Sequence, residues 1–154
     1  MMSISDIIEA YLKEILKSKG NEMIEIKRNE MADQFECVPS QINYVINTRF
    51  TVERGYLIES KRGGGGYIRI IRIEHRHDSH LIDDIIKIIN PIVSQQVAEN
   101  VLERLRNKGI ITEREEKIIL SAIDRETLAV KLPYRDELRA RVLTNIFNTL
   151  KYMK

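Results

Sequence analysis

Apolar residues recur at helical spacing near the N-terminus, and the pattern then changes several times along the chain. Over residues 5–17 they lie three and four positions apart, which predicts an amphipathic helix. The glycine-containing segment 19–21 ends this helix, and the short apolar segment 23–26 predicts an edge strand. Over residues 29–36 the apolar positions return to one face, so a second helix is predicted there.

A proline interrupts the pattern directly after the second helix. Pro39 disfavours helical geometry in the residue before it, so the second helix must end by Val38. Ser40 is a preferred N-cap residue, and it is predicted to open a third helix with one apolar and one polar face. Two short helices joined by a short turn predict a helix-turn-helix, whose second helix enters the major groove of DNA.

Two β-rich segments follow the helix pair. Residues 56–60 and 67–73 are rich in β-branched and aromatic residues, and the basic, glycine-rich segment 61–66 separates them. These segments predict a β-hairpin, and the irregular spacing of Arg69 and Arg72 indicates a bulge in its second strand. A helix-turn-helix followed at once by a hairpin with a flexible basic tip is the winged variety.

The rest of the chain shows only helical patterns. Residues 74–80 lack an apolar period and are predicted to connect two domains. Beyond them, one apolar pattern starts at Leu81, crosses or kinks at Pro91 and resumes as far as Gly109. A capping box over residues 112–115 opens another helix, and a last helix is predicted from Tyr134 to Lys151.

These patterns together predict a mainly α fold with a small β-hairpin (α+β). Residues 1–74 form a winged helix-turn-helix domain, and residues 79–154 form a helical bundle. The bundle is small for its apolar stripes, and small bundles usually bury such surface against a second copy. We therefore predict that the helical half is the dimerisation domain, because the helix that begins near Leu81 and the helix over 134–151 carry apolar stripes that a chain this short cannot bury alone.

Composition narrows the class of protein. The chain has 154 residues, 43% hydrophobic and 31% charged, which is typical of a soluble globular protein. Cys37 is the only cysteine, so no intrachain disulfide forms and no oxidising compartment is indicated. No apolar run approaches the roughly 20 residues that span a bilayer, and no signal peptide is recognisable. We therefore expect a cytoplasmic protein with no membrane partner.

Charge is unevenly distributed, although the formal net charge is only +2. Residues 1–39 are rich in acids, whereas residues 40–76 are rich in bases, which predicts a basic face in the middle segment. The bases of this segment are Arg49, Arg54, Lys61, Arg62, Arg69, Arg72 and Arg76, and its acids are Glu53, Glu59 and Glu74. Such a face suits duplex DNA as a partner.

The wing sequence over 59–70 and the reading helix over 39–50 together resemble the class three stress gene repressor family of Gram-positive bacteria. The resemblance covers essentially the whole chain. It implies a dimeric heat-shock repressor of protease and chaperone genes, which binds short repeated operators, releases them on heating and is degraded by the Clp protease. It also implies that a protein-arginine kinase modifies the DNA-binding domain, with Arg62 as the expected phosphorylation site.

Three groups of residues are candidates for DNA contact. Polar residues of the third helix are of types that hydrogen-bond base edges, although a solvated helix face is the alternative. Arg28 precedes the second helix, where it can meet a phosphate or serve only as a cap or surface residue. The glycine run loses much conformational freedom when it is ordered, so its flexibility is expected to be used. Arg62 beside it suits a narrow minor groove, and a solvent-exposed loop charge is the less favoured alternative. The candidates are Arg28, Ser40, Gln41, Asn43, Tyr44, Asn47, Thr48, Arg49, Lys61, Arg62, Gly63, Gly64, Gly65 and Gly66.

Other chemistry finds little support. The histidines of the segment 75–80 match no standard zinc spacing, and no Gly-Lys-Ser/Thr follows the glycine run, so neither a metal nor a nucleotide cofactor is predicted. Cys37 is more typical of a small buried hydrophobe than of a redox switch. No catalytic set can be assembled, so the chain is not predicted to be an enzyme. The alternatives to a repressor are a ligand sensor and a protein-interaction adaptor, each acting through residues 81–154.

Overall fold

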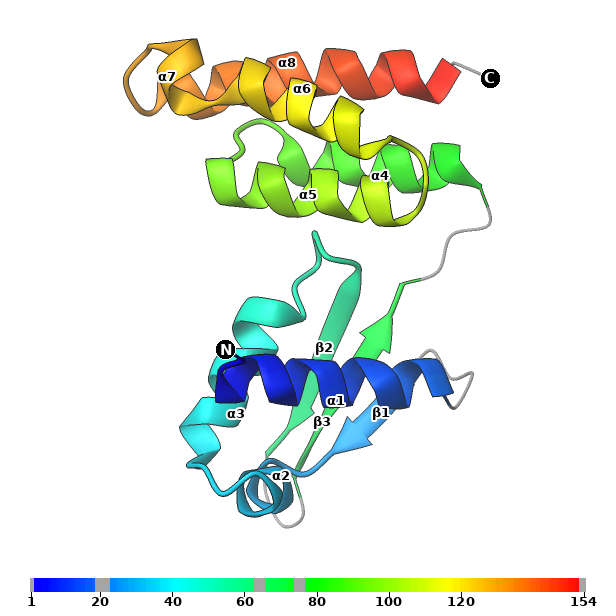
Figure 1. The fold of residues 1–154 in the computed structure, drawn as a ribbon, viewed down its shortest axis with the longest axis vertical. Helices are drawn as coiled ribbons and strands as arrows, with labels where there is room; N and C mark the ends of the chain where they lie inside the picture. Colours follow the sequence, from blue (N-terminus) through cyan, green and yellow to red (C-terminus); the bar gives the residue numbers. More distant parts are fainter. Residues whose placement is uncertain (1, 19–22, 63–65, 74–76, 153–154) are drawn as a thin grey trace. The chain divides into compact units, whose positions relative to one another are not determined.

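The computed structural model divides the chain into two compact units, Met1–Glu74 and His75–Lys154 (Figure 1). It describes residues 2–18, 23–62, 66–73 and 77–152. Helices dominate both units, and a small three-stranded sheet lies in the first. The predicted mainly α fold class with a small hairpin is therefore confirmed.

The first unit contains the predicted helix-turn-helix and wing. Its three strands form an antiparallel sheet in the order β1-β3-β2, so β1 is the edge strand that was predicted. The hairpin register runs without interruption from Tyr56 opposite Arg72 to Lys61 opposite Tyr67, so the predicted bulge is wrong. The elements are α1 (Ile4–Ser18), β1 (Met23–Ile26), α2 (Arg28–Gln34), α3 (Pro39–Arg49), β2 (Tyr56–Lys61) and β3 (Tyr67–Arg72).

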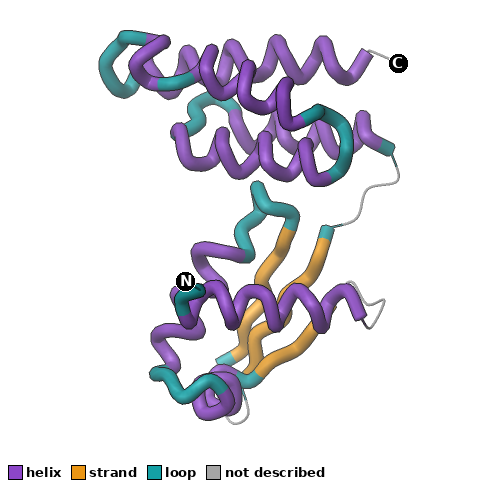
Figure 2. The backbone as a smooth tube through the Cα atoms, viewed as in Figure 1, coloured by secondary structure: helices purple, strands orange, loops and turns teal. Residues whose placement is uncertain are grey.

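The core of the first unit lies between α1, α3 and the sheet. Figure 2 shows α1 crossing in front of the strands, and Ile8 and Leu12 on its inner face are fully buried. They belong to one cluster with Ile70 of β3 and with Val45 of α3. The apolar face predicted for the third helix is thus turned inward, which leaves its polar face outward.

The start of α3 differs from the prediction. Val38 occupies the N-cap position without a side-chain cap, and Pro39 is the first helical residue. Proline suits this position because its φ is already helical and the amide hydrogen it lacks would have had no partner. Ser40 therefore lies inside the helix, and its predicted role as N-cap is wrong.

The second unit is a helical bundle, with a short helix at Arg125–Leu128 that was not predicted. Its elements are α4 (Asp78–Ile89), α5 (Gln95–Asn107), α6 (Glu113–Ile123), α7 (Arg125–Leu128) and α8 (Tyr134–Tyr152). The kinked helix through Pro91 is wrong, because Asn90 already has extended backbone geometry and a loop separates α4 from α5. The predicted connection to residue 80 is shorter, because α4 begins at Asp78. The capping box is confirmed, with Thr112 and Glu115 bonded reciprocally at 3.0 and 2.7 Å.

Most of the apolar surface of the bundle is buried within the unit itself. Leu81, Ile85 and Ile89 on α4 are at most 2% exposed, and they share a cluster with Leu143 and Phe147 of α8. The α4 stripe is therefore buried within the chain itself, so the expectation that it needs a second copy for burial is wrong. None of the helices that the structure describes is both long and apolar enough to cross a membrane.

Candidate nucleic-acid interface

A cleft of about 650 Å³ brings the predicted DNA-contact residues of three elements together. Arg28 is the first residue of α2, Asn43 lies on α3, and Lys61 and Arg62 lie at the end of β2. Cations outnumber acids along its walls, so the cleft concentrates positive potential where a nucleic acid backbone can enter. The complete lining is Lys27, Arg28, Asn29, Glu30, Asn43, Ser60, Lys61, Arg62, Gly66, Tyr67 and Ile68.

The outward face of α3 carries most of the predicted base-reading residues. Ser40, Tyr44 and Asn47 are exposed, with Tyr44 at 54%. Thr48 is exposed too, but its Oγ1 donates to the carbonyl oxygen of Tyr44 at 2.6 Å, which commits the hydroxyl proton to its own helix. This face of α3 thus presents amide and phenol groups that can meet base edges.

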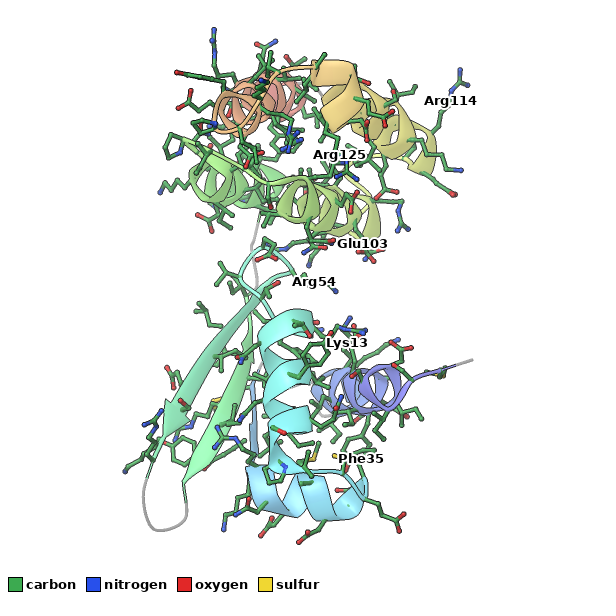
Figure 3. The ribbon with its side chains drawn as sticks, turned by 90° about the vertical axis from the view of Figure 1, so that its left-hand side faces the viewer. Lys13, Phe35, Arg54, Glu103, Arg114 and Arg125 are labelled. Atoms are coloured by element: carbon green, nitrogen blue, oxygen red, sulfur yellow. The ribbon has the colours of Figure 1, made fainter. Side chains whose placement is uncertain are left out.

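Two of the predicted base readers form hydrogen bonds with side chains of α1. The Nε2 of Gln41 donates to Ser5 Oγ at 2.7 Å. The Nη1 of Arg49 donates to Asp6 Oδ1 at 2.9 Å and to Glu9 Oε1 at 2.6 Å. Figure 3 shows α1 beside α3, with the hairpin on the other side of α3. Gln41 and Arg49 therefore connect both ends of α3 to one neighbouring helix.

The carboxylates around Arg49 are held in their charged form. Hydrogen bonds from the Ser3 amide and from Arg49 lower the pKa of Asp6. Partial burial alone would raise the pKa of Glu9, but hydrogen bonds from Lys13 and Arg49 outweigh it and lower that pKa. The same bonds from Arg49 to Asp6 and Glu9 raise the pKa of its guanidinium. This is a charge-assisted cluster between α1 and the last turn of α3.

The two cations next to the tip of the wing are exposed. Lys61 and Arg62 are exposed at the end of β2. Arg69, in the middle of β3, lies over the Tyr67 ring at 4.5 Å and faces Glu25 and Glu59 at 3.7 and 3.6 Å, so it belongs to the sheet surface. The predicted contacts at Gly63, Gly64 and Gly65 lie outside the described residues, whereas Gly66 lines the cleft.

Sequence reasoning missed several residues of the cleft. Lys27 and Asn29 flank Arg28 at the start of α2, and the charge of Lys27 beside Arg28 was a signal that could have found them. Ser60 is the last residue but one of β2 and Tyr67 is the first residue of β3, so both lie next to the basic tip of the hairpin. A search for polar residues that border the wing would have included both.

The remaining candidate chemistry is sparse. The rings of His77 and His80 pack edge to face at the start of α4, with their centroids 5.3 Å apart. His75 lies outside the described residues. Among the residues that the structure describes, no three His, Cys, Asp or Glu side chains are grouped to hold a metal ion. Cys37 is a half-buried free thiol packed against the first core.

Comparisons with known proteins cover both units. A family model described as the CtsR N-terminal HTH domain matches residues 3–74, and one described as the CtsR C-terminal dimerization domain matches residues 77–148. A solved structure described as the crystal structure of CtsR in complex with a 26bp DNA duplex is 54% identical, with a TM-score of 0.94 over 98% of this chain and 100% of that chain.

Full-length relatives carry the name transcriptional regulator CtsR. The one from Geobacillus stearothermophilus is 55% identical over 152 residues, which is 99% of both chains. The one from Bacillus subtilis is 56% identical over 149 residues, or 97% of both, and one from Staphylococcus aureus strain NCTC 8325 is 47% identical over 99% of both. These relatives are named as regulators rather than enzymes, in agreement with the sequence. With a helix-turn-helix model and a dimerization model matching its two units in order, the chain belongs to the CtsR family.

Proposed function

We propose that this chain binds operator DNA as a homodimer and represses heat-shock protease and chaperone genes. The α3 helix enters the major groove, and the end of the β2–β3 hairpin enters the neighbouring minor groove. The observation that carries the proposal is the cleft that Asn43 of α3 lines together with Lys61 and Arg62 of the wing. The relative that was solved with a DNA duplex supports the same partner.

The polar residues of α3 divide into readers and anchors. Asn43, Tyr44 and Asn47 contact base edges, because their side chains face outward or into the cleft and an Asn amide can bond adenine in two places. Gln41 and Arg49 hold α3 against α1 through the bonds described above. Ser40 lies at the margin of the helix and serves a phosphate, whereas the hydroxyl proton of Thr48 is already donated to the carbonyl oxygen of Tyr44.

The basic walls of the cleft supply the sequence-independent part of binding. Arg62 inserts into the minor groove, whose narrow stretches have an enhanced negative potential. Lys61 and Arg28 neutralise phosphates on either side, which adds affinity that weakens as salt rises. Glycines at the tip, among them Gly66, let the backbone approach the duplex closely.

Repression ends when the wing is modified or heated. Arg62 is exposed, so a protein-arginine kinase can reach its guanidinium. The added phosphate replaces a cation by an anion and repels the DNA backbone. Heating releases the operator through loss of wing contacts, and the released protein is a substrate of the Clp protease. The family to which the chain belongs supports this regulation.

Footprinting of the purified chain on duplexes from upstream of protease and chaperone genes tests the function. We expect protection of a short repeated sequence without any added ligand, with at least about a thousandfold preference over random DNA. Ligand-free operator binding also separates a repressor from the ligand-sensor alternative. Equal affinity for both DNAs across the salt range would contradict the proposal.

A further inference from the structure

A second cleft of the first unit, about 540 Å³ in volume, lies along β1, between α1 and α2. We call it the edge groove, because β1 is an outer strand of the sheet; Figure 1 shows this strand running from beside α1 to the start of α2. The edge groove shares only Lys27 and Glu30 with the lining of the cleft of the nucleic-acid interface, so most of it lies outside that cleft. Its apolar lining is Tyr11, Ile15, Met23, Ile24, Ile26 and Met31.

The backbone of β1 is paired on one side only. Its four residues, Met23–Ile26, pair antiparallel with β3, and no other strand among the described residues pairs with them. In an antiparallel pair, alternate residues direct their amide and carbonyl groups away from the partner strand. The free side of β1 therefore offers hydrogen-bonding groups to one more extended strand, which is how many proteins bind peptides.

The two faces of β1 differ in what they offer to such a strand. Ile24 and Ile26 are buried in the core, on the face of the sheet that α1 covers with Tyr11 and Ile15. Glu25 lies between them in sequence and points to the opposite face, with 47% of its side chain exposed. An added strand alternates in the same way, so its side chains toward the groove should be apolar and those beside Glu25 should be basic.

The charge of the edge groove also favours a basic occupant. Of the described residues that line it, Glu25 and Glu30 are acids and Lys27 is the one base, which is the reverse of the balance in the cleft of the nucleic-acid interface. Opposite charges on neighbouring strands stabilise their pairing, and like charges destabilise it. A strand that places glutamate beside Glu25 is thus disfavoured.

The geometry points to an extended segment of a partner protein as the occupant: a strand in which apolar residues alternate with lysine or arginine pairs with the free side of β1. Its apolar side chains enter the edge groove, where Tyr11 already packs edge to face against Phe35 with the ring centroids 5.3 Å apart. Its basic side chains lie beside Glu25. The inference goes beyond the proposed function, because it assigns a peptide-binding site to the first unit and does not depend on an operator.

The other outer strand of the sheet offers a matched control. Arg69 of β3 lies between Glu25 of β1 and Glu59 of β2, at 3.7 and 3.6 Å. Reversal of either charge removes one of these two ion pairs, so both variants disturb the surface of the sheet in the same way. Glu25 lines the edge groove and Glu59 does not.

Fluorescence anisotropy of two labelled peptides mixed with the full chain tests the assignment. The first peptide, of about nine residues, alternates Val with Lys. The second has the same charge, but Pro replaces its central Val and removes a backbone donor. We expect the first to bind at least roughly tenfold more tightly than the second. Hydrogen exchange should also slow at the amides of β1 when the first peptide is bound.

The variants locate the binding site. Glu25→Lys should weaken binding of the first peptide at least roughly fivefold, and Glu25→Gln should weaken it by a smaller factor. Glu59→Lys should leave it within about twofold of wild type. Thermal unfolding of each variant verifies folding, and Glu25→Gln decides the matter if the lysine variant does not fold.

Four outcomes would overturn the assignment. They are no binding of the first peptide up to about 1 mM, equal affinity for the two peptides, equal losses in Glu25→Lys and Glu59→Lys, and slow exchange of the β1 amides that appears in the chain alone as its concentration rises. The last outcome would give the edge of β1 to a second copy of the chain. None of these measurements contains DNA, so their failure is distinct from a failure of operator binding in the footprinting experiment.

Discussion

Arg49 on α3 donates a hydrogen bond to Glu9 on α1 at 2.6 Å, so the last turn of the reading helix is tied to α1. At the other end of α3, Gln41 reaches Ser5 of the same helix. A helix held at both ends keeps its outward residues in a fixed orientation before DNA arrives. We therefore propose that Arg49 positions α3, and its predicted role in base reading stays a prediction.

A double-mutant cycle with Arg49→Ala and Glu9→Gln tests this positioning role. Because both side chains are only partly exposed, we expect them to couple by roughly 0.5 to 1 kcal/mol in the free energy of unfolding, measured with urea. Arg49→Lys should recover part of the stability. Strictly additive effects, combined with a loss confined to operator binding, would return Arg49 to the base-reading group.

The same cluster predicts an acid-sensitive first unit. The pKa of Glu9 is lowered in the folded state from its ordinary 4.5, so its carboxylate stabilises the fold above that pH. This stability is lost as the pH falls through the ordinary value of 4.5 toward the lowered one. The free energy of unfolding, measured as the pH falls, should depend less steeply on pH in Glu9→Gln than in wild type. Glu14→Gln, on the exposed face of the same helix, should follow wild type.

Regular periodicity allowed much of the fold to be predicted. The helix-turn-helix, the hairpin and the capping box at Thr112 each rest on local chemistry that is legible in the sequence. Helix ends are less predictable: Ser40 is a preferred N-cap residue, but Pro39 occupies the first helical position and leaves the cap to Val38. The end of α4 was missed because apolar residues continue past Ile89 although the backbone turns away.

The residue types of the candidate site could be predicted from the sequence, but the direction in which each side chain points could not. Asn43, Lys61 and Arg62 line one cleft as the motifs indicated. Arg49 belongs to the polar face by helical spacing, yet it finds carboxylates on a helix 40 or more residues earlier in the chain. A long-range ion pair of this kind leaves no trace in local periodicity.

Arg62→Ala should change the salt dependence of DNA binding. Loss of a cation that contacts phosphate or the minor groove is expected to reduce the slope of log affinity against log salt by about 1, on operator and random DNA alike. Fluorescence anisotropy at several salt concentrations measures the slope. Arg114→Ala removes the same charge from an exposed position on α6, labelled in Figure 3, and an equal change there would point to net charge alone.

Arg139→Met should destabilise the second unit. The substitution removes the donors to the carbonyl oxygens of Val93 and Ile123 in a buried site, and leaving such acceptors unsatisfied costs about 1 to 3 kcal/mol each. Urea unfolding at a fixed protein concentration measures the loss. Arg141→Met, at an exposed position of α8, is the matched control and should change stability by less than about 0.5 kcal/mol.

The central claim is that α3 reads the bases of an operator, and the affinity of Asn43→Ala for operator and for random DNA tests it most directly. A lost base contact should cost about 1 to 3 kcal/mol on the operator and much less on random DNA, at the same salt and temperature. An operator affinity equal to that of wild type, or the same loss on both DNAs, would contradict the account.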